Sequence, residues 1–362
     1  MKHITEYRDP ALARNLVDRI RECAGQTGGA SIMEVCGTHT VALFRFGIKQ
    51  ALEGAVRLIS GPGCPVCVTP LSLIDKCCLL AARQDVIIAT FGDMIRVPGN
   101  RSSLQKELAS GRDIRVITSP MQALAIARSE PEKRVVLVSV GFETTTPMIA
   151  YTLLSACDER VNNLFVICAN KLVPPVLKAL IQDKDLALDG FLCPGHVSAA
   201  IGARAYNEIA HAAGIPCVIS GFEPLDMLGG IYELLSLKRN GEAKVVNAYS
   251  RVVTAGGNTK AMEVMRKVFE PCEALWRGIG SVPQSGLRLR AEFTHFDIDR
   301  HIQLEVVETE DISGCICGEI LKGKREPVDC PCFGDSCTPE HPLGACMVSS
   351  EGACRAWHRY NT

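Results

Sequence analysis

Residues 135–147, VVLVSVGFETTTP, join a short apolar run to a glycine, an acidic residue and three threonines that lead to a proline. A short run rich in valine, without alternating polar residues, is typical of a strand buried on both faces of a parallel sheet. A helical stretch, Pro147–Ala156, follows the threonines. Strand, loop and helix in this order form the repeating unit of α/β proteins, so this stretch predicts an α/β fold.

The same unit recurs along most of the chain. Short runs rich in valine and isoleucine end in loops that contain glycine or proline, and helical stretches such as Leu71–Arg83 and Ser102–Ala109 lie between them. Right-handed crossovers would stack these units into open parallel sheets with helices on both faces. The predicted strands are Ser31–Val35, Val56–Ser60, Val86–Thr90, Ile114–Thr118, Val135–Val140, Leu164–Cys168, Gly190–Leu192 and Cys217–Ser220.

The number of predicted strands favours two similar parallel-sheet α/β domains, over residues 30–120 and 121–250. The sequence Gly-Phe-Glu follows two of these strands, which hints at an internal duplication. After about residue 250 the strands weaken, so we expect a third, cysteine-rich domain over residues 251–362. Residues 1–29 form a helical segment that we expect to pack on this C-terminal domain.

The cysteine-rich tail, GCICGEILKGKREPVDCPCFGDSCTPEHPLGACMVSSEGAC, favours a metal centre. It contains seven of the chain's 18 cysteines, all within the last 48 residues. Four thiolates hold a [4Fe–4S] cluster, and four thiolates also hold a structural zinc ion. Zinc sites usually have two short CxxC pairs, and this tail has none. An iron–sulfur cluster is therefore the favoured reading and zinc the main alternative.

Composition is that of a globular protein without a nucleic-acid or membrane partner. The chain is 47% hydrophobic and 22% charged, its net charge is −1, and it has no long basic run. The N-terminus lacks the apolar segment of a signal peptide, and the apolar runs are far shorter than a membrane span. We therefore expect a cytoplasmic protein, in which cysteines stay reduced and free for metal or redox chemistry.

Several well-known enzyme motifs are absent. The sequence contains neither GxxxxGK[ST] nor a GxGxxG after a strand, which argues against the corresponding nucleotide enzymes. It also lacks CxxxCxxC, GxSxG and HExxH, the signatures of radical-SAM enzymes, α/β-hydrolases and zinc proteases.

Reactive residues follow the predicted strands instead. Ligands of open parallel sheets bind beyond the carboxyl ends of the strands, so residues at these positions are candidates for a site. They are Cys36-Gly37-Thr38-His39, Gly61–Cys67, Asp93, Glu143–Thr146, Asn170-Lys171, Cys193–His196 and Glu223-Pro224.

Two cysteine motifs stand out among these loops. Cys64-Pro65-Val66-Cys67 lies between a strand and a predicted helix, whose N-terminus would favour a thiolate. Such a pair can form a disulfide, transfer electrons or hold a metal, and it can also be two buried turn residues. Cys36 and His39 form a pair that could bind a transition metal or place a base beside a thiolate.

The other candidates have structural alternatives. His196 could line the site, cap a helix or lie in the core. Asp93, Glu143 and Glu223 could line the site or cap helices, and Thr144–Thr146 could be a capped helix start with Pro147 in the first turn. Four further cysteines have apolar neighbours and are predicted to be small core residues: Cys77, Cys78, Cys157 and Cys168.

Taken together, these motifs resemble the HypD family of hydrogenase maturation factors, and the resemblance spans nearly the whole chain. The matching strings are MEVCGTHT (33–40), SGPGCPVCVTP (60–70), FGDMIRVPG (91–99), VGFETTTP (140–147), CPGHVSAAIG (193–202), GFEPLDML (221–228) and CTPEHPLGACMVSSEGAC (337–354).

The resemblance implies a role in building the Fe(CN)2CO group of [NiFe] hydrogenases. The family acts as a scaffold with the small chaperone HypC. It receives cyanide ligands from HypE, and these ligands are made from carbamoyl groups by HypF. It also implies two similar α/β domains and a third domain with a [4Fe–4S] cluster. By position, the cluster ligands fall on Cys315, Cys330, Cys337 and Cys354.

The essential cysteines of the family fall on Cys36, Cys64 and Cys67, and its polar motif residues fall on His39, His196 and Glu351. We expect Cys36 to bind the transient iron, shared with a cysteine of the small partner. Cys64 and Cys67 either complete this metal site, with Cys67 as the expected ligand, or cycle between dithiol and disulfide. A thiol–disulfide oxidoreductase with an iron–sulfur relay and a structural zinc protein are the alternatives. The roles of Cys317, Cys332 and Cys346 stay open.

Overall fold

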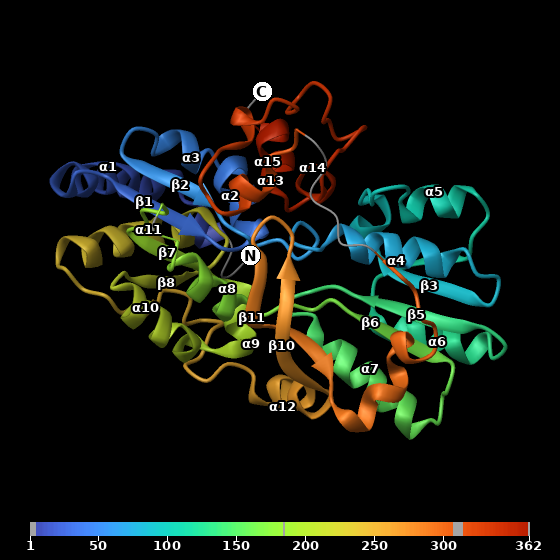
Figure 1. The fold of residues 1–362 in the computed structure, drawn as a ribbon. Coiled ribbons are helices and arrows are strands. Elements are labelled where there is room, and N and C mark those ends of the chain that lie inside the picture. The colour runs from blue at the N-terminus through green and yellow to red at the C-terminus, as the bar shows by residue number, and fades with distance from the viewer. Residues whose placement is uncertain (1–4, 184, 307–313, 361–362) are drawn as a thin grey trace.

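The computed structural model describes residues 5–183, 185–306 and 314–360. Within these residues, two parallel sheets stand side by side, an antiparallel hairpin lies between them, and a cysteine-rich tail covers one end (Figure 1). The predicted α/β class with parallel sheets is confirmed.

The first sheet has the strand order β2-β1-β7-β8-β9, and its strands are parallel. Ile32 of β1 pairs with Leu58 of β2 on one side and with Gly190 of β7 on the other. The strands are β1 (Ala30–Glu34), β2 (Val56–Ser60), β7 (Gly190–Pro194), β8 (Cys217–Ser220) and β9 (Val245–Asn247).

The second sheet has the order β4-β3-β5-β6 and is also parallel. The central strand β5 carries the run that opened the sequence analysis, and its residues from Val135 to Ser139 are buried. The strands are β3 (Val86–Phe91), β4 (Ile114–Ile117), β5 (Arg134–Ser139) and β6 (Leu164–Cys168).

Helices connect successive strands and cover the sheets. Several begin as the sequence predicts, because a capping side chain or a proline stands at the first turn; Ser119, for example, forms a capping box with Gln122. These helices are α2 (Gly37–Arg45), α3 (Ile48–Ala51), α4 (Leu71–Ala81), η2 (Gly92–Arg96), α5 (Leu104–Ala109), α6 (Pro120–Ser129), α7 (Thr146–Asp158), α8 (Val173–Leu180), α9 (Gly195–Ile201), η3 (Ala203–Tyr206), α10 (Asn207–Ala213) and α11 (Pro224–Arg239).

The two sheets do not follow the predicted division into residues 30–120 and 121–250. The chain first forms β1 and β2 of the first sheet and then all four strands of the second sheet. Its next three strands, β7, β8 and β9, complete the first sheet. A boundary at residue 120 therefore falls inside the second sheet, between β4 and β5. Buried parallel strands have similar sequences, so periodicity does not reveal which strands become neighbours.

The N-terminal segment also differs from its expected place. Its described residues form η1 (Thr5–Arg8) and α1 (Pro10–Thr27), and α1 packs mainly along α11. Ile20 and Cys23 of α1 share a buried cluster with Ile231 and Leu235 of α11. The segment thus covers the first sheet, whereas the sequence predicts packing on the C-terminal domain.

The region after residue 250 has two parts. The first contains α12 (Thr259–Val268), the antiparallel pair β10 (Phe269–Trp276) and β11 (Gly280–Leu289), η4 (Ala291–Phe296) and η5 (Ile298–Arg300). α12 packs on α7 of the second sheet, and β11 packs on α8. The second part is the tail, with α13 (Cys317–Leu321), η6 (Pro327–Asp329), α14 (Ala345–Val348) and α15 (Ala353–Tyr360).

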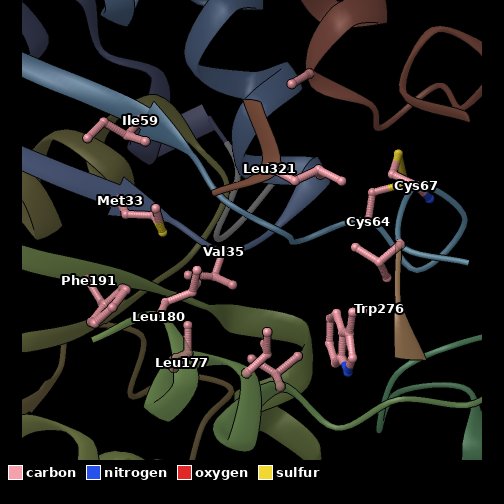
Figure 2. Close-up of a cluster of buried hydrophobic side chains, with 14 of the residues drawn as sticks. Met33, Val35, Ile59, Cys64, Cys67, Leu177, Leu180, Phe191, Trp276 and Leu321 are labelled. Carbon is pink, nitrogen blue, oxygen red and sulfur yellow. Dashed lines mark hydrogen bonds between the residues drawn. A yellow bond between two sulfur atoms is a disulfide. The ribbon is translucent and has the colours of Figure 1, made fainter. Parts of the chain in front are cut away.

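A single buried cluster joins the first sheet, the hairpin and the tail. Figure 2 shows part of it, with Met33 and Phe191 from the first sheet, Leu321 from the tail, and Trp276 of the hairpin below Cys64. Burial of apolar surface therefore holds the tail against the sheet that carries the candidate residues.

Candidate functional site

Cys36 lies where β1 ends and α2 begins. It occupies the N-cap position of α2, where its side chain makes no capping hydrogen bond. The residue is 8% exposed. Burial raises the pKa of the Cys36 thiol to about 12, and the nearby carboxylates of Glu351 and Glu34 act in the same direction. The thiol is therefore protonated at neutral pH, and a metal ion that binds it displaces the proton.

The backbone around Cys36 is held by a buried carboxylate and by close packing. Glu34 Oε2 accepts the N–H of Cys36 at 2.9 Å, and Glu34 Oε1 accepts the hydroxyl of Thr40. A Cβ on Gly63 would stand 2.2 Å from the Cys36 nitrogen, and one on Gly37 would stand 2.4 Å from Glu351 Cβ. Only glycine allows these approaches, so the loop after β2 and the tail both press against Cys36.

Two histidines contact one aromatic ring. Phe222, in the loop after β8, stacks on His196 at 4.0 Å between ring centres and contacts His39 at 4.8 Å. Nε2 of His39 donates to the carbonyl of Gly221 at 2.9 Å. Burial lowers the pKa of His39 to about 4, so its ring is neutral. Nδ1 of His39 is then an acceptor, and it has no hydrogen-bond partner among the described residues.

Glu351 brings the tail into this group. Its Oε1 accepts the hydroxyl of Thr38 at 2.6 Å, and its charge acts on both Cys36 and His196. Burial lowers the pKa of His196, and Glu351 partly opposes this. The structure thus gathers Cys36, His39, His196 and Glu351 around the carboxyl edge of the first sheet.

The CxxC pair is a disulfide. Cys64 and Cys67 are bonded to each other, with 5.3 Å between their Cα atoms, and the N–H of Cys67 lies 3.2 Å from Cys64 Sγ. The helix that follows begins only at Leu71, so the pair lies in a turn and not at the helix N-terminus that the sequence suggests. In this form Cys67 has no thiolate to offer a metal ion.

The acidic residues split between the two predicted roles. Glu223 is the N-cap of α11 and pairs with Arg8, and Glu143 Oε1 accepts the N–H of Val173 at 3.0 Å, at the start of α8. These two residues have the helix-capping role. Asp93, in contrast, reaches the tail beside the disulfide and bonds to Ser349 and Ser350.

The remaining predicted core residues are mostly buried. Cys77 is 0% exposed and Cys78 is 9% exposed, which agrees with the prediction. Cys157 and Cys168 are only partly buried, at the edge of the second sheet's core. Pro147 lies in the first turn of α7, as predicted, but Thr145 at the N-cap position makes no side-chain capping hydrogen bond.

Sequence reasoning missed three residues of the site. Glu34, Phe222 and Ser349 lie inside the matched strings, but each has an ordinary side chain for its setting. Glu34 could have been suspected, because a carboxylate in a buried strand needs a partner. The position of Phe222 between two histidines depends on tertiary structure and leaves no signal in the sequence.

Comparison with known proteins identifies the family of this chain. A model of the HypD family, described as the hydrogenase formation hypA family, matches residues 11–361. The chain belongs to the HypD family. Hydrogenase maturation factors HypD from Azotobacter vinelandii and Escherichia coli (strain K12) are 44% and 43% identical to it, over 99% of this chain and 97% and 98% of theirs. The HypD of Rhodobacter capsulatus is 42% identical over 99% of this chain.

The HypD resemblance read from the sequence is thus confirmed, and with it a place in hydrogenase formation. The described part of the chain has no helix with the length and apolar character needed to cross a membrane.

The tail cysteines provide a donor set that suits the cluster expected of HypD proteins. Cys315 hydrogen-bonds with Cys317, and this contact, together with burial, raises the pKa of the Cys315 thiol. Cys317 and Cys354 each hydrogen-bond with Cys346. All seven tail cysteines belong to, or pack against, the buried cluster that joins the tail to the first sheet.

Two details suit the sulfur atoms of a bound cluster. The N–H of Leu343 lies 3.4 Å from Cys337 Sγ, and a Cβ on Gly344 would stand 3.4 Å from Cys315 Sγ. N–H donors stabilise cluster sulfurs, and glycine leaves room beside them. Among the described residues no three His, Cys, Asp or Glu side chains converge on a point as around one metal ion. A four-iron cluster is larger than one ion and needs its ligands farther apart.

Proposed function

We propose that this protein is a scaffold and redox factor for the assembly of the Fe(CN)2CO group of [NiFe] hydrogenases. In this role it would work with a HypC-type small chaperone and a HypE-type cyanide donor. The observation that carries the proposal is the gathering of Cys36, two histidines and Glu351 at one sheet edge, in a chain of the HypD family. This role keeps the protein in the cytoplasm, where its other thiols stay reduced.

Cys36 is the residue that would hold the cargo iron. Low-spin iron that carries cyanide and carbon monoxide suits a soft thiolate ligand. Cys36 lies at the rim of the sheet, and close packing of Gly37 and Gly63 fixes its backbone. A cysteine of the small partner would supply a second thiolate to the same iron.

The polar neighbours of Cys36 would act on the diatomic ligands. His39 is neutral and fixed by its bond to Gly221, so its ring has one orientation. His196 is more exposed and stacks on Phe222. These groups, together with Glu351, would hold or move protons as ligands arrive.

The disulfide supports the redox part of the proposal. Cys64 follows Gly63, whose carbonyl accepts the N–H of Gly37 at 3.0 Å, so the pair is next to the Cys36 loop. Cys64 and Cys67 would cycle between disulfide and dithiol as ligands are attached. The predicted [4Fe–4S] cluster, held by Cys315, Cys330, Cys337 and Cys354, would supply single electrons when bound.

An infrared spectrum of the anaerobically purified protein, co-expressed with its small partner, tests the scaffold role. Cyanide and carbon monoxide on iron absorb where proteins are otherwise silent, so we expect bands there. Cys36→Ala should abolish these bands and keep the brown colour of the cluster. Cys23→Ala is the matched control, because Cys23 is also buried but lies in α1. Bands of full intensity in Cys36→Ala would refute the scaffold role.

The second candidate is a thiol–disulfide oxidoreductase with an iron–sulfur relay. The Cys64–Cys67 disulfide favours it, because the same pair can exchange with partner thiols. The oxidoreductase hypothesis does not explain why Cys36 and His39 lie together beside the disulfide. A brown protein without infrared bands, and with no iron beyond the four atoms of a cluster, would favour this candidate.

A further inference from the structure

The Cys64–Cys67 disulfide is shielded from solvent by the tail. Cys64 is 4% exposed and Cys67 is 1% exposed. The carbonyl oxygen of Ala345 lies 3.8 Å from Cys67 Sγ, and Ser349 Oγ lies 3.3 Å from Cys64 Sγ. We call residues 345–350 the cover segment, since they lie against both sulfurs. An incoming thiolate must reach one of these sulfurs directly to break the bond.

The cover segment is held in place by the second sheet. Asp93 Oδ2 accepts hydrogen bonds from Ser349 Oγ at 3.2 Å and from the N–H and hydroxyl of Ser350 at 3.1 and 3.2 Å. The guanidinium of Arg96 donates to the carbonyl of Val348 at 3.0 Å. Both side chains come from η2, directly after β3.

These bonds join three parts of the molecule at one point. The disulfide belongs to the loop after β2 in the first sheet, η2 belongs to the second sheet, and the cover segment belongs to the tail. A charged partner on one side of each bond makes it stronger than a neutral hydrogen bond. The contacts of Asp93 and Arg96 therefore add to the apolar packing of residues 345–348 in opposing the departure of the cover segment from the sulfurs.

We infer that Asp93 and Arg96 are positioning residues for the disulfide, which hold residues 345–350 across Cys64 and Cys67 and so control the access of a reducing dithiol. The inference deepens the proposed redox role of this pair and rests on it. The reductant is a small dithiol or a dithiol protein. One thiolate of the dithiol attacks a sulfur of the pair, which breaks the S–S bond, forms a mixed disulfide and releases the other cysteine. The second thiol of the reductant then attacks the reductant sulfur of the mixed disulfide and releases the remaining cysteine. The dithiol becomes a disulfide, and its two electrons and two protons convert Cys64 and Cys67 into thiols.

The test measures the rate at which dithiothreitol reduces the pair in the full-length protein. Samples are quenched with an alkylating reagent, and mass spectrometry follows the tryptic peptide of residues 58–76, which contains both cysteines. Asp93→Ala should raise the second-order rate constant about ten-fold or more, because it removes every bond that Asp93 makes to the cover segment. Arg96→Gln should give a smaller rise.

Asp75→Ala is the matched control. Asp75 also accepts a backbone N–H, that of Asn100 at 2.9 Å, and holds a loop that belongs to the second sheet and not to the cover segment. Its rate should equal that of the wild type. An equal rise in Asp75→Ala, or no rise in Asp93→Ala, would overturn the inference.

The conservative variant Asp93→Asn separates positioning from general loosening. Asparagine keeps an oxygen that accepts the Ser350 N–H, so its rate should fall between the wild type and Asp93→Ala. A rate in Asp93→Asn as high as that in Asp93→Ala would contradict positioning by this acceptor. The measurement needs no cargo iron. Missing infrared bands with a normal rate response would therefore count against the scaffold role alone.

Discussion

Two buried carboxyl groups, Glu34 and Glu143, ionise less readily than exposed ones. Burial raises the pKa of each to about 7. Both carboxyl oxygens of Glu34 accept hydrogen bonds from residues around Cys36. Glu143 Oε2, in contrast, has no hydrogen-bond partner among the described residues. The sequence could flag both as acids next to buried strands. It could not tell which one supports the site, because that depends on the neighbours that each meets after folding.

Glu143 should make stability depend on pH. Its pKa is higher in the folded protein than in the unfolded chain, so the unfolded chain releases this proton first as the pH rises. The carboxyl is therefore expected to lower the free energy of unfolding between about pH 4.5 and pH 7, by up to about 3 kcal/mol. Glu143→Gln should remove this loss, so the variant gains stability over wild type at pH 8 relative to pH 5.

Urea unfolding of both proteins at the two pH values measures the effect. Glu22→Gln, at an exposed position of α1, should leave the pH dependence as in the wild type. The same pH dependence in wild type and Glu143→Gln would mean that this carboxyl is already ionised in the fold.

At the scale of elements, the buried strands were predictable and the hairpin was not. β2, β6 and β8 have the predicted bounds, and the other predicted strands agree within a few residues. β10 and β11 contain Pro271, Pro283 and Gly286, which usually interrupt strands, so their sequence resembles a loop. β11 packs on α8, and Trp276 shares a buried cluster with the tail; no local sequence pattern shows these contacts.

Trp276 is the residue through which the hairpin is expected to stabilise the fold. It is 0% exposed, stacks with Phe142 at 6.0 Å between ring centres, and donates its indole N–H to Ser285 Oγ at 2.7 Å. Trp276→Ala should lower the free energy of unfolding by about 3–5 kcal/mol, measured by denaturant titration. Leu275→Ala, at the neighbouring exposed position, should cost less than about 1 kcal/mol. Similar losses in both variants would show that the hairpin has no special anchor.

At the scale of the whole molecule, the candidate site depends on segments far apart in the chain. Cys36, Phe222 and Glu351 come from the loop after β1, the loop after β8 and the tail. The resemblance to the HypD family could name most of these residues from their motifs. The resemblance could not give the strand order of the first sheet. This order brings the loop after β1 close to the loop after β8, although the second sheet lies between them in the sequence.

The interleaved topology predicts that neither half of the chain folds alone. A fragment of residues 30–120 has β1 and β2 without β7, and β3 and β4 without β5. Each strand pair would expose apolar surface that its missing neighbour covers. We expect fragments 30–120 and 121–250 to lack cooperative unfolding by circular dichroism, whereas residues 84–172, which contain all of the second sheet, should retain more structure. A cooperative transition in fragment 30–120 would contradict this prediction.

The same topology affects how the protein forms during synthesis. β1 and β2 leave the ribosome early, but their central neighbour β7 begins at Gly190. Translation of residues 61–189 takes on the order of ten seconds, and throughout that time two apolar strands and the Cys36 loop have no sheet to join. The second sheet is continuous in the chain and can close meanwhile. The N-terminal part of the nascent chain would therefore need a chaperone that binds its exposed strands. Slower translation before Gly190 would prolong the time for which these strands are exposed.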